Sequence, residues 1–196
     1  MVRRPSIDDD LIFFSFEGKG TYIRAKDGSI YEGEWAFDQR SGYGTLAIRQ
    51  QDKNDPKKAG SMRKVYAGGW ANNEFNGFGT YYYEDGYYEG EWQDHKQNGW
   101  GTRHYPDGSR YDGEWKNGKR HGQGVLVLGN HDKYEGMWMN DMKEGPGRFY
   151  YRSKNQVYQG EWVLDVPKCG TLMALPLGRT DKGLASTLPK VCDVFK

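Results

Sequence analysis

The sequence has 196 residues, which is enough for one ordinary domain or one array of repeats and too few for two large domains. Glycine accounts for 28 residues, Trp, Tyr and Phe for 7, 15 and 8, and proline for 7, a composition that excludes both a disordered chain and a collagen-like one. The 28 basic residues balance the 27 acidic ones, so there is no overall charge to attract nucleic acid or an anionic bilayer.

The N-terminal arm, residues 1–16, contains three consecutive aspartates at positions 8–10 and lacks the apolar core of a signal peptide. No stretch of the sequence is as long and apolar as a membrane-spanning helix requires. These features predict a soluble, intracellular protein. The apolar run at residues 11–16 is expected to add a strand that caps the first hairpin, while the aspartates discourage further strand pairing.

From residue 17 to residue 175 the sequence follows a repeat of about 23 residues. A Tyr-x-Gly-x-Trp motif occurs six times, with tyrosine spacings of 35, 22, 23, 23 and 24. A Gly-x-Gly pair lies between successive motifs, beginning with a half unit at Gly18 and Gly20, and the last copy, at residues 168–170, keeps only its second glycine. The structural repeat positions are Tyr31, Gly33, Trp35, Tyr66, Gly68, Trp70, Tyr88, Gly90, Trp92, Tyr111, Gly113, Trp115, Tyr134, Gly136, Trp138, Tyr158, Gly160 and Trp162.

Each unit is predicted to form a β-hairpin. Residues that tolerate positive φ, such as Asp27 and Gly28, precede most of the motifs, as hairpin turns require. Side chains alternate along a strand, so the Tyr, Gly and Trp of one motif share a face. A helical interpretation fails because glycine interrupts every apolar stretch. Since one unit cannot bury a face alone, we expect the hairpins to stack into an elongated, twisted, single-layer antiparallel β ribbon.

The long spacing between the first two motifs reflects an insertion, residues 49–64, with a net charge of +4. Its candidate basic patch consists of Lys53, Lys57, Lys58, Arg63 and Lys64. Such a charged run is usually a solvated loop, and the alternative is docking on an acidic protein surface or an anionic lipid. No aromatic residues alternate with the basic ones, which argues against nucleic acid as the partner.

The repeat ends after Thr171, and residues 176–196 form a C-terminal tail with two prolines and scattered apolar residues. The tail is typical of neither a strand nor a long helix. We expect it to fold back over the last repeat or to become ordered on a partner. Cys169 and Cys192 are interpreted as reduced thiols, because neither shows a zinc-binding or Cys-x-x-Cys spacing.

These motifs resemble the MORN repeat family, whose unit also has about 23 residues and carries the Tyr-x-Gly-x-Trp and Gly-x-Gly signatures, and the resemblance covers roughly residues 16–175. It implies a single-layer antiparallel sheet with a groove on one side. It also implies roles as scaffolds, dimer-forming adaptors and peptide-binding platforms in cytoskeletal structures. Several members belong to ciliary and flagellar axonemes, including radial spokes, and others have been proposed to bind phospholipid head groups.

Most of the Tyr and Trp area is expected to pack between neighbouring hairpins. The bulky residues of the second strand of each unit are candidates for an exposed groove, because exposed aromatic side chains bordered by charge mark interaction sites. The candidate groove residues are Tyr22, Tyr81, Tyr83, Arg103, Tyr105 and Tyr151. A peptide or a helix of a partner protein is the expected ligand.

No catalytic, cofactor or metal site is predicted. The four histidines, His95, His104, His121 and His131, have no fixed ligand spacing, and each Gly-x-Gly leads into a strand instead of the helix N-terminus of a phosphate site. We therefore expect a non-catalytic scaffold of a ciliary or flagellar axoneme, for example a radial spoke, that binds other proteins or a second copy of itself. The alternative is a peripheral membrane adaptor that binds acidic phospholipids through the basic insertion.

Overall fold

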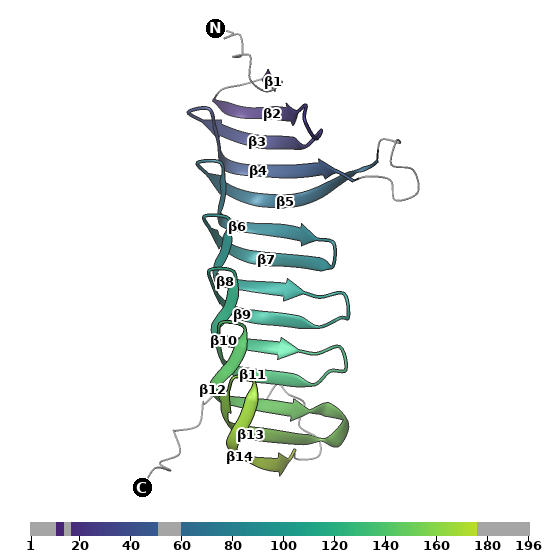
Figure 1. Ribbon diagram of the computed structural model, residues 1–196, viewed down its shortest axis with the longest axis vertical. Helices are drawn as coiled ribbons and strands as arrows, with labels where there is room; N and C mark the ends of the chain where they lie inside the picture. The colour runs from purple at the N-terminus through teal and green to yellow at the C-terminus, as the bar shows by residue number, and fades with distance from the viewer. Residues whose placement is uncertain (1–10, 14–16, 51–59, 176–196) are drawn as a thin grey trace. The chain divides into compact units, whose positions relative to one another are not determined.

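The computed structural model describes residues 11–13, 17–50 and 60–175 (Figure 1). These residues form strands almost throughout, and the one helical element among them is a 3-10 turn, Arg152–Lys154. Within this described part, no helix is long and apolar enough to cross a membrane. The prediction of an almost purely β protein is confirmed. The chain divides into two compact units, residues 1–96 and 97–196.

In the first unit the strands form an open antiparallel sheet whose order follows the chain. They are β1 (Leu11–Phe13), β2 (Gly18–Arg24), β3 (Ile30–Ala36), β4 (Gln39–Arg49), β5 (Met62–Ala71), β6 (Glu74–Tyr83) and β7 (Gly86–Gln93). β1 pairs with β2, with Leu11 opposite Arg24. The expected capping strand is therefore present at residues 11–13, whereas residues 14–16 lie outside the described part of the chain.

The second unit repeats this arrangement. Its strands are β8 (Lys96–His104), β9 (Arg110–Lys116), β10 (Lys119–Val127), β11 (Lys133–Met139), β12 (Met142–Tyr151), β13 (Gln156–Val163) and β14 (Val166–Ala174). β14 contains the incomplete seventh copy of the repeat, and its Gly170 lies opposite Gly160. Strand pairing thus continues past the last complete motif.

Two kinds of turn join the strands. The predicted turns that precede the motifs contain residues such as Gly28 and Gly108, at φ +67° and +82°. At the other end of each hairpin, tight turns follow the motif tryptophan, and their residues have positive φ, as at Asn72 (50°) and Asn73 (70°). This geometry matches the right-handed twist of the flanking strands. The tight turns are Phe37–Asp38, Asn72–Asn73, Asp94–His95, Asn117–Gly118, Asn140–Asp141 and Leu164–Asp165.

The glycine of each motif gives room to the ring of the motif tyrosine. Gly33 lies opposite Gly44, and a Cβ on Gly33 would come within 2.5 Å of the Tyr31 Oη. The Tyr31 hydroxyl donates to the carbonyl of Glu34 over 2.9 Å. Four further tyrosines make the same bond, over 2.9 to 3.1 Å, and like Tyr31 they are almost completely buried: Tyr66, Tyr88, Tyr111 and Tyr134. Side-chain burial and hydrogen bonding therefore both depend on the glycine pair.

The motif tryptophan links one hairpin to the previous one. The indole Nε1 of Trp70 donates to the carbonyl of Gly44 over 3.1 Å, and its ring meets that of Tyr31 edge to face at 5.1 Å. Equivalent hydrogen bonds of 3.0 to 3.3 Å are made by Trp35, Trp92, Trp115 and Trp138. The prediction that Tyr and Trp pack between neighbouring hairpins is confirmed.

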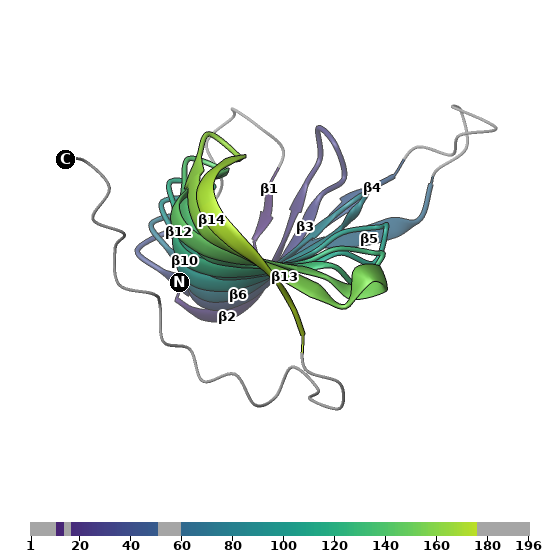
Figure 2. The same cartoon turned by 90° about the horizontal axis from the view of Figure 1, so that it is seen from below.

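The first glycine of the Gly-x-Gly pair bends the strand. Gly42 and Gly77 have φ of +66° and +79°, and the register shifts between Gly33 and Trp35, as a β-bulge requires. Figure 2 shows curved rather than straight strands in both units. We call the face that carries the motif tyrosines and tryptophans the inner face, and the opposite one the outer face.

Candidate functional site

On the inner face, a second set of side chains lies beside the buried motif residues. They are the second and fourth residues after each Gly-x-Gly, and the register places the first of them opposite a motif tyrosine, as with Tyr22 and Tyr31. In the first unit they are Tyr22, Arg24, Leu46, Ile48, Tyr81 and Tyr83. In the second unit they are Arg103, Tyr105, Leu126, Leu128, Phe149 and Tyr151. All six residues that the sequence predicted for a groove belong to this set.

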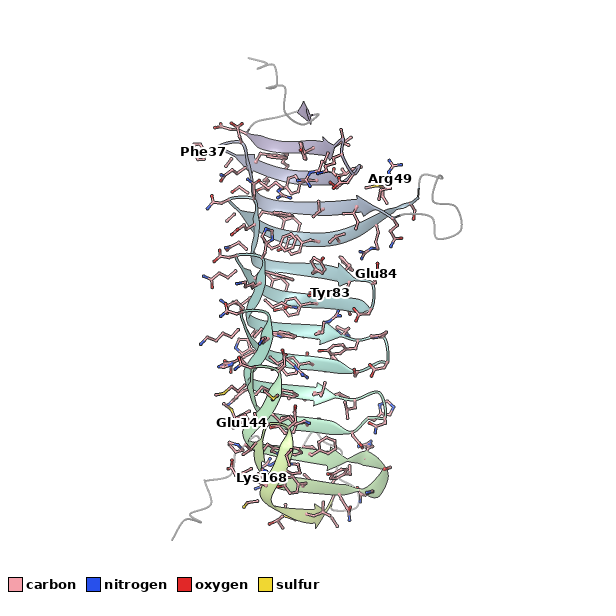
Figure 3. All side chains as sticks on the ribbon, in the orientation of Figure 1. Phe37, Arg49, Tyr83, Glu84, Glu144 and Lys168 are labelled. Atoms are coloured by element: carbon pink, nitrogen blue, oxygen red, sulfur yellow. The ribbon has the colours of Figure 1, made fainter. Side chains whose placement is uncertain are left out.

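In the first unit, the predicted groove residues are half-buried aromatics that contact neighbouring rings. Tyr81 and Tyr83 lie on β6 with ring centroids 4.5 Å apart, and Tyr81 also lies 5.9 Å from Trp92. Figure 3 labels Tyr83 near the end of this strand, beside Glu84. Tyr22 on β2 meets the indole of Trp35 at 5.9 Å. The rings of Tyr22 and Tyr81 therefore rest on buried tryptophans, and all three rings keep part of their surface exposed.

The predicted groove residues of the second unit differ in exposure. Tyr105 and Tyr151 are half-buried, and the Tyr151 ring lies 4.7 Å from that of Phe149. Arg103 was expected to be an exposed contact, and this expectation is wrong, since its side chain is only 7% exposed. Its guanidinium packs 5.1 Å from the ring centroid of Tyr105, which covers it and gives it a structural role.

A concavity of about 630 Å³ opens on the inner face of the first unit. The predicted residue Tyr22 lines it together with Leu46 and Ile48. Residues that the sequence reasoning missed also line it, most importantly Arg40, whose guanidinium stacks 4.4 Å from the ring centroid of Trp70. The signal was present in the sequence, because a basic residue stands five positions after the tryptophan in three copies, at Arg40, Arg120 and Lys143.

The polar side chains that line this concavity make contacts within the first unit. Arg24 pairs with Asp27 at 3.6 Å, and hydrogen bonds from Ser29 lower the pKa of the Asp27 carboxyl. Burial lowers the pKa of His95, whose Nδ1 accepts a hydrogen bond from the Phe75 amide over 3.3 Å. Throughout the described ranges, no group of three or more His, Cys, Asp or Glu side chains is placed to hold a metal ion.

The predicted basic patch is only partly within the described residues. Lys53, Lys57 and Lys58 lie outside them. The Arg63 guanidinium donates to the carbonyls of Tyr82 and Tyr83 over 2.7 and 3.3 Å, so it ties β5 to the end of β6. Lys64 is exposed on β5. Arg63 therefore has a structural role in the sheet in addition to its charge.

The outer face carries large exposed aromatics that were not proposed as a site. Tyr43 and Phe78 occupy the central position of Gly-x-Gly in the first unit and are 62% and 61% exposed, and Trp100 holds this position in the second unit at 57%. Substituting them gives a matched control for any test of the inner face, because the substitutions remove a similar amount of aromatic surface and leave the inner face unchanged.

A chain built from β-hairpins that share their aromatic side chains in this way is a hairpin-repeat protein. The model of the MORN repeat matches residues 31–49, 66–86, 88–110, 111–133 and 134–156, more than half of the sequence. The chain is also 58% identical over 173 residues to MORN repeat-containing protein 3 of Xenopus laevis, an alignment that covers 88% of this chain and 69% of that protein. The chain belongs to the MORN repeat family. Repeats of this family commonly mediate association with proteins or membranes and are generally non-catalytic.

Proposed function

We propose that this protein is a non-catalytic adaptor that binds an extended or helical segment of a partner protein on its inner face. The observation that carries the proposal is the row of half-buried Tyr, Leu and Ile side chains beside the concavity of the first unit. Partly exposed aromatics that already rest on a rigid layer lose little side-chain entropy on binding, which suits them as contact residues. The charged groups at its edge, among them Arg24 and Asp27, add orientation.

The test compares the two faces of the first unit. A Tyr81→Ala/Tyr83→Ala variant removes two inner-face rings, and a Tyr43→Ala/Phe78→Ala variant removes two outer-face rings. Both variants and the wild-type chain are used to capture proteins from an extract of ciliated cells, with quantitative mass spectrometry. We expect specific partners to be lost with the inner-face variant and retained with the outer-face variant. Equal capture by the two variants, with circular dichroism showing both folded, would contradict the proposal.

We further propose that the partner belongs to a ciliary or flagellar axoneme, for example a radial spoke. Support for this comes from the resemblance of the repeats to those of axonemal scaffold proteins. A tagged copy expressed in ciliated cells should co-localise with axonemal tubulin and remain after detergent extraction. A diffuse signal that is lost on extraction would rule out this location while leaving the inner face as a binding site.

The basic insertion favours a second candidate, a peripheral adaptor on anionic membranes. Sedimentation with phosphatidylserine vesicles tests it, and the variant of choice neutralises Lys57, Lys58 and Lys64 but keeps Arg63, which the fold uses. Binding that requires the anionic lipid, falls with salt and disappears in this variant would establish the membrane function. Failure to sediment would leave the protein adaptor as the proposal.

A further inference from the structure

One position of the repeat is built alike in both units. The fifth residue after a motif tryptophan, here called the stacking position, exchanges hydrogen bonds with the second residue of the next tight turn. At Arg40 the backbone amide donates to Asn73 Oδ1 over 2.9 Å, and the Asn73 amide donates to the Arg40 carbonyl over 3.1 Å. The same pair of bonds joins Arg120 to Asp141 over 3.0 and 3.1 Å.

The two arginine side chains also match closely. The Arg40 Nη2 donates to the Asn73 carbonyl over 2.9 Å, and the Arg120 Nη2 donates to the Asp141 carbonyl over 2.7 Å. Each guanidinium stacks on the tryptophan of the next repeat, at 4.4 Å from the Trp70 centroid and 4.3 Å from the Trp138 centroid. The fold therefore builds this position in the same way whether the turn residue is an amide or a carboxylate.

The stacking positions at Arg40 and Arg120 differ in the charge of the turn residue that contacts the guanidinium. Arg120 forms an ion pair with Asp141 (Nε to Oδ1, 3.2 Å), and Lys143, the stacking residue of the next repeat, pairs with Asp165 at 3.5 Å. Arg40 has the neutral Asn73 instead, with Nε to Oδ1 at 3.4 Å. Among the described residues no carboxylate lies within ion-pair distance of Arg40. A partly buried cation without a counter-charge is electrostatically unfavourable, and an incoming anion relieves it.

The groups around Arg40 do not supply the missing counter-charge either. Burial is the main cause that lowers the pKa of the Arg40 guanidinium; the positive charge of Arg24 also lowers it, whereas Tyr31 and Tyr22 act in the opposite direction. Two carboxylates also line the concavity, but Asp27 pairs with Arg24, and Asp38 lies exposed in the first tight turn. The Nη1 group of Arg40 has no hydrogen-bond partner among the described residues. One guanidinium with a free edge and one unbalanced charge suits a single carboxylate better than a phosphate dianion.

We propose that Arg40 binds the carboxylate of an Asp or Glu residue in the partner segment, whose neighbouring apolar side chains pack against Tyr22, Leu46 and Ile48. This inference rests on the proposed function of the inner face and specifies the chemistry of its partner. The partner carboxylate takes the electrostatic role that Asp141 and Asp165 have in the second unit. The first unit thus selects an acidic segment, and the equivalent cations of the second unit are neutralised by the chain itself.

The decisive variant is Asn73→Asp, which gives Arg40 its own carboxylate with almost no change in shape. Random peptides displayed on phage are selected on the full wild-type chain, and each selected peptide is then synthesised with its acidic residue as Glu or as Gln. We expect the selected peptides to be enriched in acidic residues next to apolar ones. Both Asn73→Asp in the protein and Glu→Gln in the peptide should weaken binding by about tenfold or more, as measured by fluorescence anisotropy.

The second unit provides the matched control. Asp141→Asn removes a carboxylate that the proposal does not use, so it should leave the affinity of these peptides unchanged. Peptides that bind Asn73→Asp as tightly as the wild type would overturn the carboxylate site while leaving the inner face intact as a binding surface. Peptides that bind the Tyr22→Ala and the Tyr81→Ala/Tyr83→Ala variants as tightly as the wild type would instead overturn the proposed function itself.

A last arm tests the type of anion. Inorganic phosphate and acetate are each titrated into the complex of the wild-type chain with its best acidic peptide, at constant ionic strength. The proposal expects the two ions to displace the peptide at similar, high concentrations, because neither carries the apolar neighbours. Displacement by phosphate at much lower concentration than acetate would overturn the assignment to a carboxylate.

Discussion

The two units of the chain share the same hairpin geometry but differ in the charge of the residue that faces the stacked cation. Residues 97–175 pair their stacked cations with the aspartates of the following turns, as in Arg120 with Asp141. Residues 17–50 and 60–96 place Arg40 against an asparagine and let it face a concavity. The distances around the two arginines agree to within 0.2 Å, as for the Nε to Oδ1 contacts of 3.4 and 3.2 Å. The backbone geometry of a repeat therefore does not dictate its charge.

The comparison identifies the positions of a repeat protein that can vary to determine binding specificity. Positions in contact with the glycine pair are fixed by close packing, so Tyr31 in the first unit and Tyr111 in the second are both buried and bonded alike. The turn side chains face partly into solvent and can change from amide to carboxylate without moving the backbone. Comparing the units thus distinguishes the residues that maintain the hairpin structure from those that can vary to bind a partner.

The largest effect we expect is unfolding in alkali, and it should involve both units. Burial raises the pKa of Tyr31 to about 12 and raises the pKa of Tyr66, Tyr111 and Tyr134 in the same direction. An unfolded tyrosine titrates near pH 10, so the folded state holds more protons above that pH. Stability is complete below pH 10 and is lost as the pH rises toward 12, by about 1.4 kcal/mol per tyrosine and pH unit.

The measurement follows the β signal in circular dichroism and tyrosinate absorbance in one titration. The two units should lose their structure in the same pH range, because each has at least two tyrosines with raised pKa: Tyr31 and Tyr66 in the first unit, and Tyr111, Tyr134 and Tyr158 in the second. Two separate alkaline transitions would show that the two units differ in their stability toward alkali. Complete tyrosine ionisation with an unchanged β signal would contradict the burial argument itself.

The next largest effect concerns the glycines beneath the tyrosine rings. Gly44→Ala and Gly124→Ala place a methyl group against the rings of Tyr31 and Tyr111. Each should lower the free energy of unfolding by about 3 kcal/mol or more, since neither the ring nor the paired backbone has room to move. Urea unfolding measures the loss, and equal losses are expected in the two units.

Substitutions at two other glycines show how much of the stability loss comes from backbone conformation alone. Gly77 and Gly108 have φ of +79° and +82°, and a Cβ at either position would meet nothing within 4 Å. Gly77→Ala and Gly108→Ala should therefore cost only about 1 kcal/mol, from the left-handed conformation. If Gly44→Ala were no worse than Gly77→Ala, close packing under Tyr31 could not be the reason for the glycine.

The sequence was sufficient to predict the hairpins, the faces and the buried motif residues. The motif residues recur at a fixed spacing, so the positions of Gly33 and Trp35 can be recognised in every repeat. The capping strand at residues 11–13 was predictable as well, because an apolar run beside a sheet edge has few other places to go. These features depend on residue type and spacing alone.

The environment of each polar side chain was less predictable. Arg103 follows the same spacing as Tyr81 but is buried under Tyr105, and Arg63 binds carbonyls of β6 instead of contributing only to a basic patch. Arg40 was missed because its importance comes from a contact with Asn73, 33 residues away. Contacts between neighbouring repeats decide the environment of such a side chain, and the sequence reveals them only when the same position is compared from one repeat to the next.

A smaller effect should follow from exchanging the two turn residues. Asn73→Asp creates an ion pair with Arg40, and Asp141→Asn removes the one with Arg120. The first variant should gain and the second should lose about 0.5 to 1 kcal/mol of unfolding free energy at low salt, because these partly exposed pairs are screened by solvent. Urea unfolding at low and high salt measures both. A shift of the same sign in both variants would contradict the idea that only charge distinguishes the units.

The smallest effect concerns two apolar residues in tight turns, one in each unit. Phe37 and Leu164 have φ of 52° and 50°, where other copies carry Asn72 and Asn140 at 50°. Phe37 is 86% exposed and projects from the end of its hairpin (Figure 3). Asparagine tolerates this conformation better than other side chains, so Phe37→Asn and Leu164→Asn should each stabilise the protein by about 0.5 kcal/mol.

Thermal unfolding of the single variants and of the double variant measures this gain. The gains should be equal and additive, because the two turns share a conformation and no partner. If Leu164→Asn stabilises the chain but Phe37→Asn does not, the Phe37 ring must contribute contacts that offset its strained backbone. That result would mean that the two turns, although they share a backbone conformation, differ in what their apolar side chains contribute to stability.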